Sequence, residues 1–580
     1  MTEVAVDRAV VKKPSSWRIL GQALRDRKTG FMLLFGFASG LPFALFLGTL
    51  FAWLTEAEVD LETMGVFSLI GLAYAFQFIW SPLIDKADLP GLRRLGKRKQ
   101  WIIPMQLLLG AILVTMAALD PRSQLGLFSL LAGIGALASA TQDIAINAWR
   151  IDVADQKATL DILSTVYQMG FRLSSLAGGA LALIIAERIG WPQTYLIMGG
   201  LLLAIGAAGI FAPDRGRDPV AAQTESDEQV RALRRAGELS PKVRYRALAI
   251  VGLLWGGAIV VLLNFMIQSM TALPENRPDP TEFTLNWGPW VIVATIVIPA
   301  LVAGWLAGQQ RRGENLLAED APPASGASFA LDHLYRALVL PLVEFVGRMG
   351  WSLVLILALV LTYRICDAIW GTFAYPFYLG ELQYTKDEVA FASKFFGVGA
   401  IVLGLALGGW MLTALGRMPT LLIGGLLAAL TNLLYADMAA GGRVMGAVAD
   451  STGFAALVSS FPGGSEKLAR LMLTIGGENL AIGIAGAAFV AWLSSIVSKQ
   501  FSAVQYALLS SLTLLIGTLG RGALGQMIER QGFYDVFILT TWIGVAAMVL
   551  VVAEWWRQTR PGAHGVVAPE AKDMAAVPAE

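Results

Sequence analysis

The sequence predicts an all-α, polytopic membrane protein, built as two six-helix bundles with two extra helices inserted between them. Three observations support this class. Of the 580 residues, 56% are hydrophobic and 15% are charged, and the mean hydropathy is +0.61, whereas an average soluble domain carries roughly 25% charged residues. Apolar runs of about 20 residues, the length of a spanning helix, recur along the chain. A long polar linker divides these runs into two groups.

The composition also excludes several kinds of site. The chain holds a single cysteine, Cys366, and two histidines, His333 and His564. These numbers argue against a disulfide framework, a Cys-rich metal site and a His-dependent triad. The net charge of +1 gives no overall basic character that would favour nucleic acid. We therefore expect no metal, no cofactor besides a proton gradient and no nucleic-acid partner, and the polar N-terminus predicts no signal peptide.

Fourteen apolar runs are long enough to span a bilayer. The first six lie near 31–54, 63–84, 101–119, 126–149, 162–186 and 193–212. The inserted pair lies near 246–270 and 288–308, and the last six lie near 350–379, 387–412, 418–439, 467–497, 502–524 and 533–558. Segment 327–348 is shorter and mixes leucines with Asp332, Arg336 and Glu344, which predicts an interfacial amphipathic helix.

Basic residues predict the orientation of the spans, because cytoplasmic loops collect Lys and Arg. The N-terminal tail holds seven, the turn "DKADLPGLRRLGKRKQ" after the second span holds six, and the linker 213–246 holds eight. The hairpin "TEAEVDLE" on the opposite side holds four acids and no basic residue. Both termini are therefore expected in the cytoplasm.

This topology divides the chain into seven segments. They are a cytoplasmic tail (1–30), an N-terminal bundle (31–212), a cytoplasmic linker (213–245), the extra helix pair (246–308), a cytoplasmic segment with the amphipathic helix (309–349), a C-terminal bundle (350–558) and a cytoplasmic tail (559–580). An internal repeat supports the two bundles, since "ERIGW" (187–191) closes the fifth span and "ERQGF" (529–533) closes its counterpart. Bundles related by an axis along the membrane normal explain this match.

Glycine spacing predicts close helix packing within each bundle. Gly36 and Gly40 lie four residues apart in the first span, and Gly404 and Gly408 repeat this spacing in the second bundle. Small residues at that interval let two helix backbones approach closely.

Seven ionisable residues lie within predicted spans or near their ends, where a charge at the bilayer centre costs about 2.5–3.5 kcal/mol. They are Asp143, Arg172, Arg364, Asp367, Lys394, Glu478 and Arg521. Left unpaired, they would together cost more than the net stability of a typical domain. We therefore expect them to face one another or a water-filled cavity shared by the two bundles.

Spacing suggests how some of these groups are arranged. Asp143, Asn147 and Arg150 recur at i, i+4 and i+7, so they share one face of the fourth span. Arg364 and Asp367 lie three residues apart and can pair on one helix face. Two of the arginines also have simpler interpretations: Arg150 can mark the cytoplasmic boundary, and Arg521 can reach the membrane interface.

The carboxylates are the candidates for proton coupling. Burial disfavours the charged form of a carboxyl group, so such a group could take up and release a proton near neutral pH. The candidates are Asp143, Asp367 and Glu478. Candidates for binding a polar ligand are Gln142, Asn147, Arg172, Arg364, Lys394, Asn479 and Gln505. The amides among them could equally bridge helices.

Several stretches are similar to those of a known family. They are the run from Gly36 to Lys86, "ASATQDIAINAWRIDV" ending at Val153, "GFRLSSLAGGALAL" from Gly170, "YRICD" at 363–367, "SK" at 393–394 and "ENLAIGIAGAAFVAWLSSIVSKQFSAVQYALLSSL" from Glu478. Together they resemble the AmpG family of muropeptide permeases over most of 31–212 and 350–558. The turn with Asp85-Lys86 and Gly96-Lys97-Arg98-Lys99 resembles a loosened form of the cytoplasmic loop motif of major facilitators.

The resemblance implies the major facilitator fold and a secondary active transporter that is not an enzyme. It further implies proton-driven import of a small-molecule substrate, GlcNAc-1,6-anhydro-MurNAc with or without its stem peptide, across the bacterial inner membrane for peptidoglycan recycling. Arg172, Arg364 or Lys394 could meet the carboxylates of such a muropeptide. We expect alternating access by a monomer in membrane lipid.

The chain also departs from the family pattern. Many relatives carry an acid where this chain has Asn147, so either Asp143 serves alone or the coupling site lies elsewhere. The extra helix pair and the loop 440–466 lie outside the core pattern. Because acetyl-CoA transporters belong to the same branch, another large anionic metabolite such as acetyl-CoA is the alternative substrate. An intramembrane enzyme acting on lipid-linked sugars is a third hypothesis, disfavoured because nucleophile and metal motifs are absent.

Overall fold

The computed structural model describes most of the chain, and the described part is helical. It covers residues 25–59, 73–74, 76–213, 238–271, 276, 278, 280–317, 326–364, 373–374 and 376–559. Turns and one isolated antiparallel bridge, between Leu239 and Leu316, join the helices of this part. The predicted all-α fold class is confirmed. Several predicted segments lie outside the described residues: half of span 63–84, part of span 350–379, and most of the linker and of both tails; Asp367 lies outside them too.

The described helices of the first bundle agree closely in their bounds with five of its six predicted spans, 63–84 being only partly described. They are α2 (Arg27–Ala44), α3 (Leu50–Glu56), α6 (Ser81–Lys86), α7 (Lys99–Ala117), α8 (Leu125–Val153), α9 (Leu160–Ser175), α10 (Ala182–Ile189) and α11 (Trp191–Gly209). A π-helical segment, Leu45–Thr49, joins α2 to α3, and another, Leu176–Leu181, joins α9 to α10.

The insert and the second bundle follow. The insert holds α13 (Pro241–Thr271), α14 (Pro280–Ile292), α15 (Ile298–Arg312), α16 (Ala327–Leu338) and α17 (Leu340–Met349). The second bundle holds α18 (Ser352–Thr362), α20 (Lys386–Ala390), α21 (Gly397–Ala414), α22 (Arg417–Ala439), α25 (Glu466–Ser495) and α26 (Ser502–Thr559). Two short helices, α23 (Arg443–Ser451) and α24 (Phe454–Ser459), fill the predicted loop 440–466 and pack on α25.

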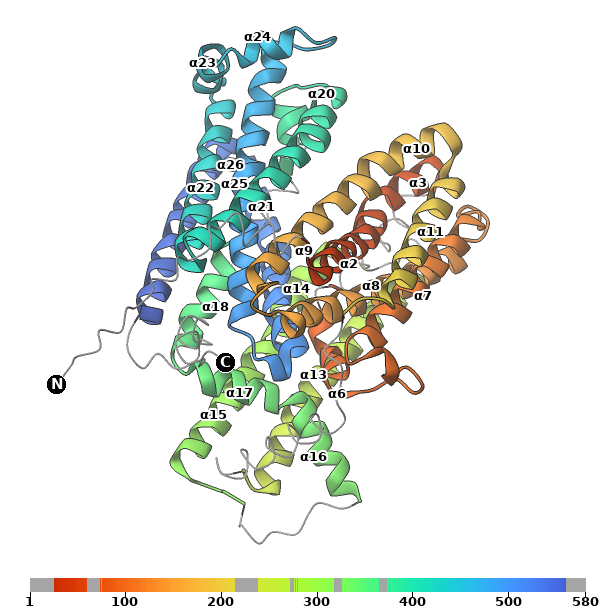
Figure 1. The fold of residues 1–580 in the computed structure, drawn as a ribbon, viewed down its shortest axis with the longest axis vertical. Helices are drawn as coiled ribbons and strands as arrows, with labels where there is room; N and C mark the ends of the chain where they lie inside the picture. The colour runs from red at the N-terminus through yellow and green to blue at the C-terminus, as the bar shows by residue number, and fades with distance from the viewer. Residues whose placement is uncertain are drawn as a thin grey trace, which may run out of the picture.

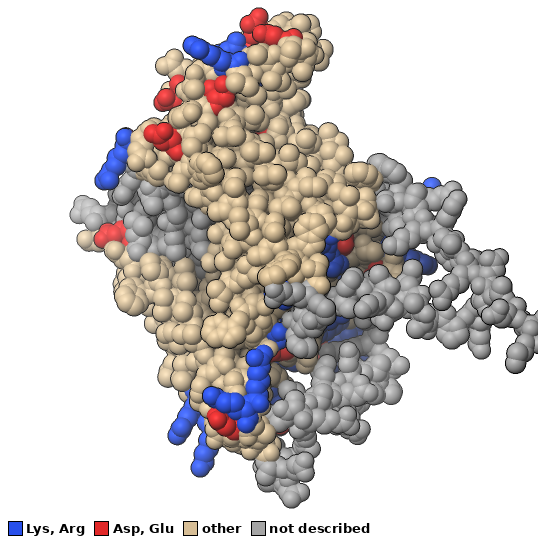
Figure 2. Space-filling model, turned by 90° about the vertical axis from the view of Figure 1, so that its left-hand side faces the viewer, with Lys and Arg blue, Asp and Glu red and all other residues tan. Residues whose placement is uncertain are grey.

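The described residues contain ten helices long and apolar enough to cross a membrane, or eleven if the bent pair α17 and α18 is counted as one span. The fourteen predicted spans include segments that are only partly described, so fourteen stays a prediction. The distribution of charge is that of a membrane protein: the middle of the face shown in Figure 2 is mostly free of charged side chains.

The structure corrects one element of the sequence analysis. Segment 327–348 was expected to form one amphipathic helix, but it forms two, α16 and α17, which break at Val339. Pro341 lies in the first turn of α17, a position that proline favours because the first amide groups of a helix have no partner within it. The chain then bends by 103° between α17 and α18.

The internal repeat is visible in the backbone. Gly190, between α10 and α11, has φ 88° and ψ 162°. Gly532, which interrupts α26, has φ 83° and ψ 171°. Both torsion pairs are open to glycine and strained for other residues, so the "ERIGW" and "ERQGF" segments make the same sharp turn between their last two spans.

The two bundles contact each other toward one end. In Figure 1 their ribbons meet low in the view and separate toward the top. The helix pairs that carry this contact are α9 with α21 and α25, and α26 with α6 and α8. We call the end that holds α6 and the start of α26 the joined end, and the end that holds α10, α23 and α24 the far end.

Glycines set the closest helix pair of the first bundle, α2 with α9. A Cβ atom on Gly36 would collide with the backbone carbonyl of Tyr167, and one on Gly170 would collide with the carbonyl of Leu33. In the second bundle a Cβ on Gly404 would meet the backbone of Leu480 on α25 in the same way. The prediction of close packing from glycine spacing is therefore confirmed for both glycine pairs.

We expect Gly36→Ala to destabilise the protein by about 1–3 kcal/mol, because α2 and α9 must move apart to admit the methyl group. Thermal unfolding of the purified protein in detergent measures the effect. Gly30→Ala is the matched control, because Gly30 lies on the same helix with nothing within 4 Å of an added Cβ. Equal unfolding temperatures for the two variants would contradict the packing described here.

Candidate functional site

Asp143 lies at the centre of a polar cluster in the first bundle. Its Oδ1 accepts hydrogen bonds from the hydroxyl groups of Ser39 and Tyr167, each at 2.6 Å. These two hydroxyl oxygens are themselves 3.2 Å apart. The close approach of α2 and α9 brings Ser39 and Tyr167 to the same carboxylate on α8, so the glycine contacts build this cluster.

Two amides flank Asp143 on α8. Gln142 donates through Nε2 to the carbonyl of Ala38 at 2.7 Å, and Asn147 donates through Nδ2 to the carbonyl of Asp143 at 2.9 Å. The side-chain oxygens of both amides are buried, and neither has a hydrogen-bond partner among the described residues. Buried polar atoms are usually satisfied, so these two acceptors are available to a ligand or to water.

Arg150 continues the same face of α8, as the spacing predicted. Its side chain is fully buried and donates through Nη2 to the hydroxyl of Ser494 on α25 at 2.9 Å. The guanidinium lies over the ring of Tyr167 at 4.9 Å and over the ring of Tyr506 on α26 at 5.1 Å, measured to the ring centroids. Arg150 therefore contacts both bundles, and the simpler interpretation as a boundary marker does not describe its surroundings.

Glu478 lies in the second bundle in a cluster of its own. It accepts a hydrogen bond from the hydroxyl of Tyr435, which lies 2.9 Å from the hydroxyl of Tyr378. Its neighbour Asn479 donates to the carbonyl of Ile475 at 2.8 Å. Asp143 and Glu478 are thus placed in separate bundles, each bound to a tyrosine of its own bundle.

The remaining basic candidates differ in how far they are buried. Arg172 and Arg364 are half-buried, and Lys394 is exposed on the π-helical segment Phe391–Phe396. Asp367 and the side chain of Arg521 lie outside the part of the chain that is described. The structure therefore leaves the predicted pair of Arg364 with Asp367 as a prediction.

Gln505 lies at the joined end and is fully engaged there. It accepts a hydrogen bond from the backbone N–H of Ser498 at 2.8 Å and donates to Glu344 on α17 at 2.6 Å. It also donates to the carbonyl of Pro341 at 3.0 Å, while Arg348 donates to its oxygen at 3.3 Å. In this conformation Gln505 anchors α17 to the start of α26.

A buried ion-pair network, not predicted from the sequence, connects the bundles at the joined end. Arg98, at the start of α7, pairs with Asp85 at 2.8 Å and with Asp152 at 2.7 Å, and it donates to Ser502 on α26 at 2.8 Å. Burial by itself lowers the pKa of Arg98, but the two carboxylates outweigh burial and hold the pKa above its usual value. Arg98 thus keeps its charge.

The network also uses the first turn of α26. The carboxylate of Asp85 accepts hydrogen bonds from the backbone N–H groups of Ala503 at 3.4 Å and Val504 at 3.1 Å. The N-terminus of a helix attracts negative charge, because its first N–H groups have no partner within the helix. Asp85 of the first bundle therefore caps a helix of the second bundle.

A second ion pair crosses the bundles at this end. Arg417, at the start of α22, contacts Asp161 near the start of α9 at 2.6 Å. Nearby, Gly409 on α21 packs against the side chain of Thr165 so closely that an added Cβ would meet it at 2.8 Å. Polar links and tight packing both hold the joined end closed.

The insert contacts both bundles at the joined end. Helix α16 packs on α6 of the first bundle, and α17 packs on α26 of the second. Ion pairs hold α16 against α13. Arg244 on α13 pairs with Asp332 on α16 at 3.3 Å and with Glu238, just before α13, at 2.7 Å. Arg336 on α16 reaches the same Glu238 at 3.1 Å.

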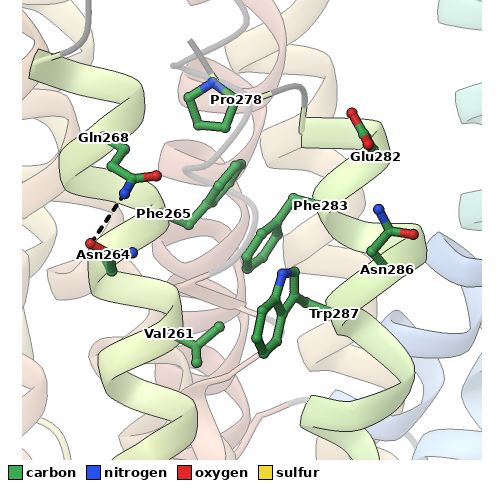
Figure 3. A pocket seen from close by; sticks show the side chains of 9 residues that line it. All are labelled: Val261, Asn264, Phe265, Gln268, Pro278, Glu282, Phe283, Asn286 and Trp287. Carbon is green, nitrogen blue, oxygen red and sulfur yellow. Dashed lines mark hydrogen bonds between the residues drawn. The ribbon is translucent and has the colours of Figure 1, made fainter. Parts of the chain in front are cut away.

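A cavity of about 320 Å³ lies between α13 and α14 (Figure 3). Phe265 and Phe283 stack across it with ring centroids 3.8 Å apart. The residues that line it come from the insert: Val261, Asn264, Phe265, Gln268, Pro278, Glu282, Phe283, Asn286 and Trp287. It is separate from the polar groups on α8. Within the described residues, no group of three or more His, Cys, Asp or Glu side chains is placed to bind a metal.

Comparison with known proteins gives relatives along nearly the whole chain. The anhydromuropeptide permease of Escherichia coli (strain K12) is 27% identical over 529 residues, which make up 90% of this chain and 79% of the permease. "Putative transporter AmpG 4" of Rickettsia conorii (strain ATCC VR-613 / Malish 7) is 24% identical over 530 residues, covering 91% of this chain and 96% of that protein. The model of a family described as acetyl-coenzyme A transporter 1 matches residues 30–125.

A solved structure matches the fold. It is the major facilitator proton:xylose symporter XylE bound to 6-bromo-6-deoxy-D-glucose, with a TM-score of 0.51 and 12% sequence identity over 97% of this chain and 100% of the symporter. At this identity the match establishes the fold and nothing of the ligand. The sequence motifs and the fold agree: this multi-pass membrane protein has the fold of major facilitator transporters, and it is similar to AmpG permeases and transporters over nine tenths of its length.

Proposed function

We propose that the chain imports anhydro-muropeptides, GlcNAc-1,6-anhydro-MurNAc with or without stem peptide, across the bacterial inner membrane by proton-coupled alternating access. The observation that carries this proposal is the similarity to the Escherichia coli anhydromuropeptide permease over 90% of the chain. Import would supply wall fragments for peptidoglycan recycling. The chain would act as a monomer in lipid, with the proton gradient as its energy source.

The orientation follows from the charge of the joined end. The turn between α6 and α7, with its six basic residues from Lys86 to Lys99, lies at this end. Basic loops favour the cytoplasmic side, so we place the joined end and both termini in the cytoplasm. The conformation described here is then closed toward the cytoplasm, ready to take up substrate from outside.

The surroundings of Asp143 support a role in proton coupling. Within the described part of the chain no Lys or Arg lies within salt-bridge distance of this carboxylate; its bound partners are the hydroxyl groups of Ser39 and Tyr167. A hydroxyl group can either donate or accept a hydrogen bond, so the cluster can hold both the charged and the protonated carboxyl group. In the second bundle Glu478 also accepts a hydrogen bond from a tyrosine, Tyr435.

Polar atoms near Asp143 suit a substrate rich in amides and hydroxyls. The buried side-chain oxygens of Gln142 and Asn147 can accept hydrogen bonds from N–H and O–H groups. Arg172 and Arg364 are half-buried guanidinium groups that could bind the lactyl or peptide carboxylates.

Acetyl-CoA is the second candidate substrate, favoured by the match of residues 30–125 to the acetyl-coenzyme A transporter family. That match covers a small part of the chain, whereas the AmpG relatives match nine tenths of it.

Uptake into proteoliposomes distinguishes the two candidate substrates. We expect an inward proton gradient to drive accumulation of radiolabelled anhydro-disaccharide and to leave acetyl-CoA outside. Accumulation of acetyl-CoA alone would reverse the assignment.

Asp143→Asn should abolish gradient-driven accumulation and leave membrane insertion intact, because the amide keeps the shape of the carboxyl group and cannot carry the proton. Uptake would then stop near equal concentrations on both sides of the membrane. Asp120→Asn, on the exposed turn between α7 and α8, is the control and should accumulate substrate normally. Full accumulation by Asp143→Asn would remove this residue from the coupling role.

Asp85→Asn should loosen the joined end, because the amide loses the charge that binds Arg98 and the α26 N-terminus. Hydrogen bonds to charged groups contribute about 1.5–3 kcal/mol, so the population open to the cytoplasm should rise about tenfold or more. In a Cys366→Ser background, reactivity of a cysteine at Ala503, whose side chain is buried at the joined end, with a thiol reagent measures that population. Asp88→Asn, whose carboxylate pairs with the exposed Arg93, serves as control. Unchanged reactivity in Asp85→Asn would show that the Asp85 contacts do not hold the joined end closed.

A further inference from the structure

Arg150 has a property that packing alone does not explain. Its side chain is fully buried, yet its Nε and Nη1 have no hydrogen-bond partner among the described residues. A buried guanidinium with unpaired N–H groups is costly. The known contacts, one hydrogen bond to Ser494 and two ring faces, offset only part of that cost.

We propose that Arg150 couples the protonation of Asp143 to the opening of the joined end. The inference rests on the proposed proton coupling and adds a residue and a direction to it. An ionised Asp143 stabilises the buried charge of Arg150 and keeps the joined end closed. A protonated Asp143 leaves that charge uncompensated, and the joined end opens.

The geometry links the two groups through one side chain. Tyr167 donates its hydroxyl to Asp143 at 2.6 Å and presents its ring to Arg150 at 4.9 Å. A hydrogen bond from the phenol to a carboxylate enriches the ring in electron density, which strengthens its attraction to a cation. Protonation of Asp143 weakens both this ring contact and the direct attraction between the charges.

Among the described residues, the other carboxylates near this face of α8 are already paired. On the elements packed against this helix, Asp85 of α6 and Asp152 of α8 itself bind Arg98 at the start of α7. In the part of the chain that the structure describes, the further titratable groups that face Asp143 or Arg150 are tyrosines: Tyr74, Tyr167 and, on α26, Tyr506. Asp143 is therefore the acid on this face of α8 that can respond to pH and act on Arg150.

Arg150 contacts the second bundle, so the free energy of burying its charge depends on whether the joined end is closed. Ser494 and Tyr506 belong to α25 and α26, whereas Asp143 and Tyr167 belong to the first bundle. When the bundles part, Ser494 and Tyr506 leave and water reaches the guanidinium. Opening thus relieves the burial of an uncompensated charge.

The expected size of the coupling follows from Coulomb's law. Seven residues of helix separate the Cα atoms of Asp143 and Arg150 by about 10 Å. At an effective dielectric constant of about 20, loss of one charge at that distance changes the open-to-closed ratio by roughly tenfold. Because linkage is reciprocal, opening the joined end in turn favours the protonated form of Asp143 by the same factor.

The test measures the joined end directly and needs no substrate. In the full-length chain with Cys366→Ser, spin labels at Lys157 and Leu415, exposed positions of the two bundles, report the distance between them in lipid nanodiscs. Lowering the pH should raise the open fraction about tenfold. Asp143→Asn and Arg150→Gln should each remove this pH dependence.

Arg150→Lys separates charge from shape. Lysine keeps the positive charge and loses the planar contacts, so we expect this variant to keep a pH dependence that Arg150→Gln lacks. Arg443→Gln, at an exposed position of the far end, should behave as the parent. A full pH response in Arg150→Gln, or its equal loss in Arg150→Lys, would overturn the proposal.

The same data distinguish this inference from the proposed function. If the pH response depends on Arg150 while no muropeptide accumulates in proteoliposomes, the coupling of Asp143 to the joined end is supported and the substrate assignment is wrong. If muropeptide accumulates and the distance between the labels at the joined end does not change with pH, Arg150 has no coupling role.

Discussion

The desolvation of charge is the constraint on which this structure depends. A charged side chain at the centre of a bilayer costs about 2.5–3.5 kcal/mol even on the most lenient scale. The chain meets this cost in two ways. Arg98 forms ion pairs with Asp85 and Asp152 where the bundles meet. Asp143 instead accepts hydrogen bonds from the hydroxyls of Ser39 and Tyr167, partners that tolerate a change of protonation state. The first arrangement favours a stable contact, and the second favours a group that changes its charge.

Glycine packing and charge placement depend on each other. Ser39 and Tyr167 reach the same carboxylate because Gly36 and Gly170 let α2 and α9 approach to backbone contact. At the joined end, Asp85 reaches the first turn of α26 across the bundle boundary. Polar contacts and tight helix packing hold the two bundles together at this end, and the polar contacts can be exchanged for water at modest cost in the proposed movement of the bundles. The insert adds α16 and α17 to the same end, so it is placed to influence that movement.

Much of the fold could be predicted from the sequence, because apolar runs, basic loops and glycine spacing are local signals. The shared face of Asp143, Asn147 and Arg150 follows from helical periodicity alone. The partners of these residues could not be predicted in this way. Ser39, Tyr167 and Ser494 are ordinary polar residues within apolar helices, and tertiary packing alone brings them together. The six basic residues of the α6–α7 turn indicated orientation. The N–H groups at the start of α26 that bind Asp85 lie more than 400 positions away in the sequence. The break between α16 and α17 did have a local signal, Pro341.

The central claim is that the two bundles part at the joined end as they close at the far end. Fluorophore pairs in single molecules test it most directly, with one pair at Lys157 and Leu415 and the other at Arg188 and Asp387, all exposed positions. Observed in liposomes during proton-driven uptake, the first distance should lengthen whenever the second shortens. A joined end that keeps one distance throughout uptake, or two distances that rise and fall together, would contradict the account.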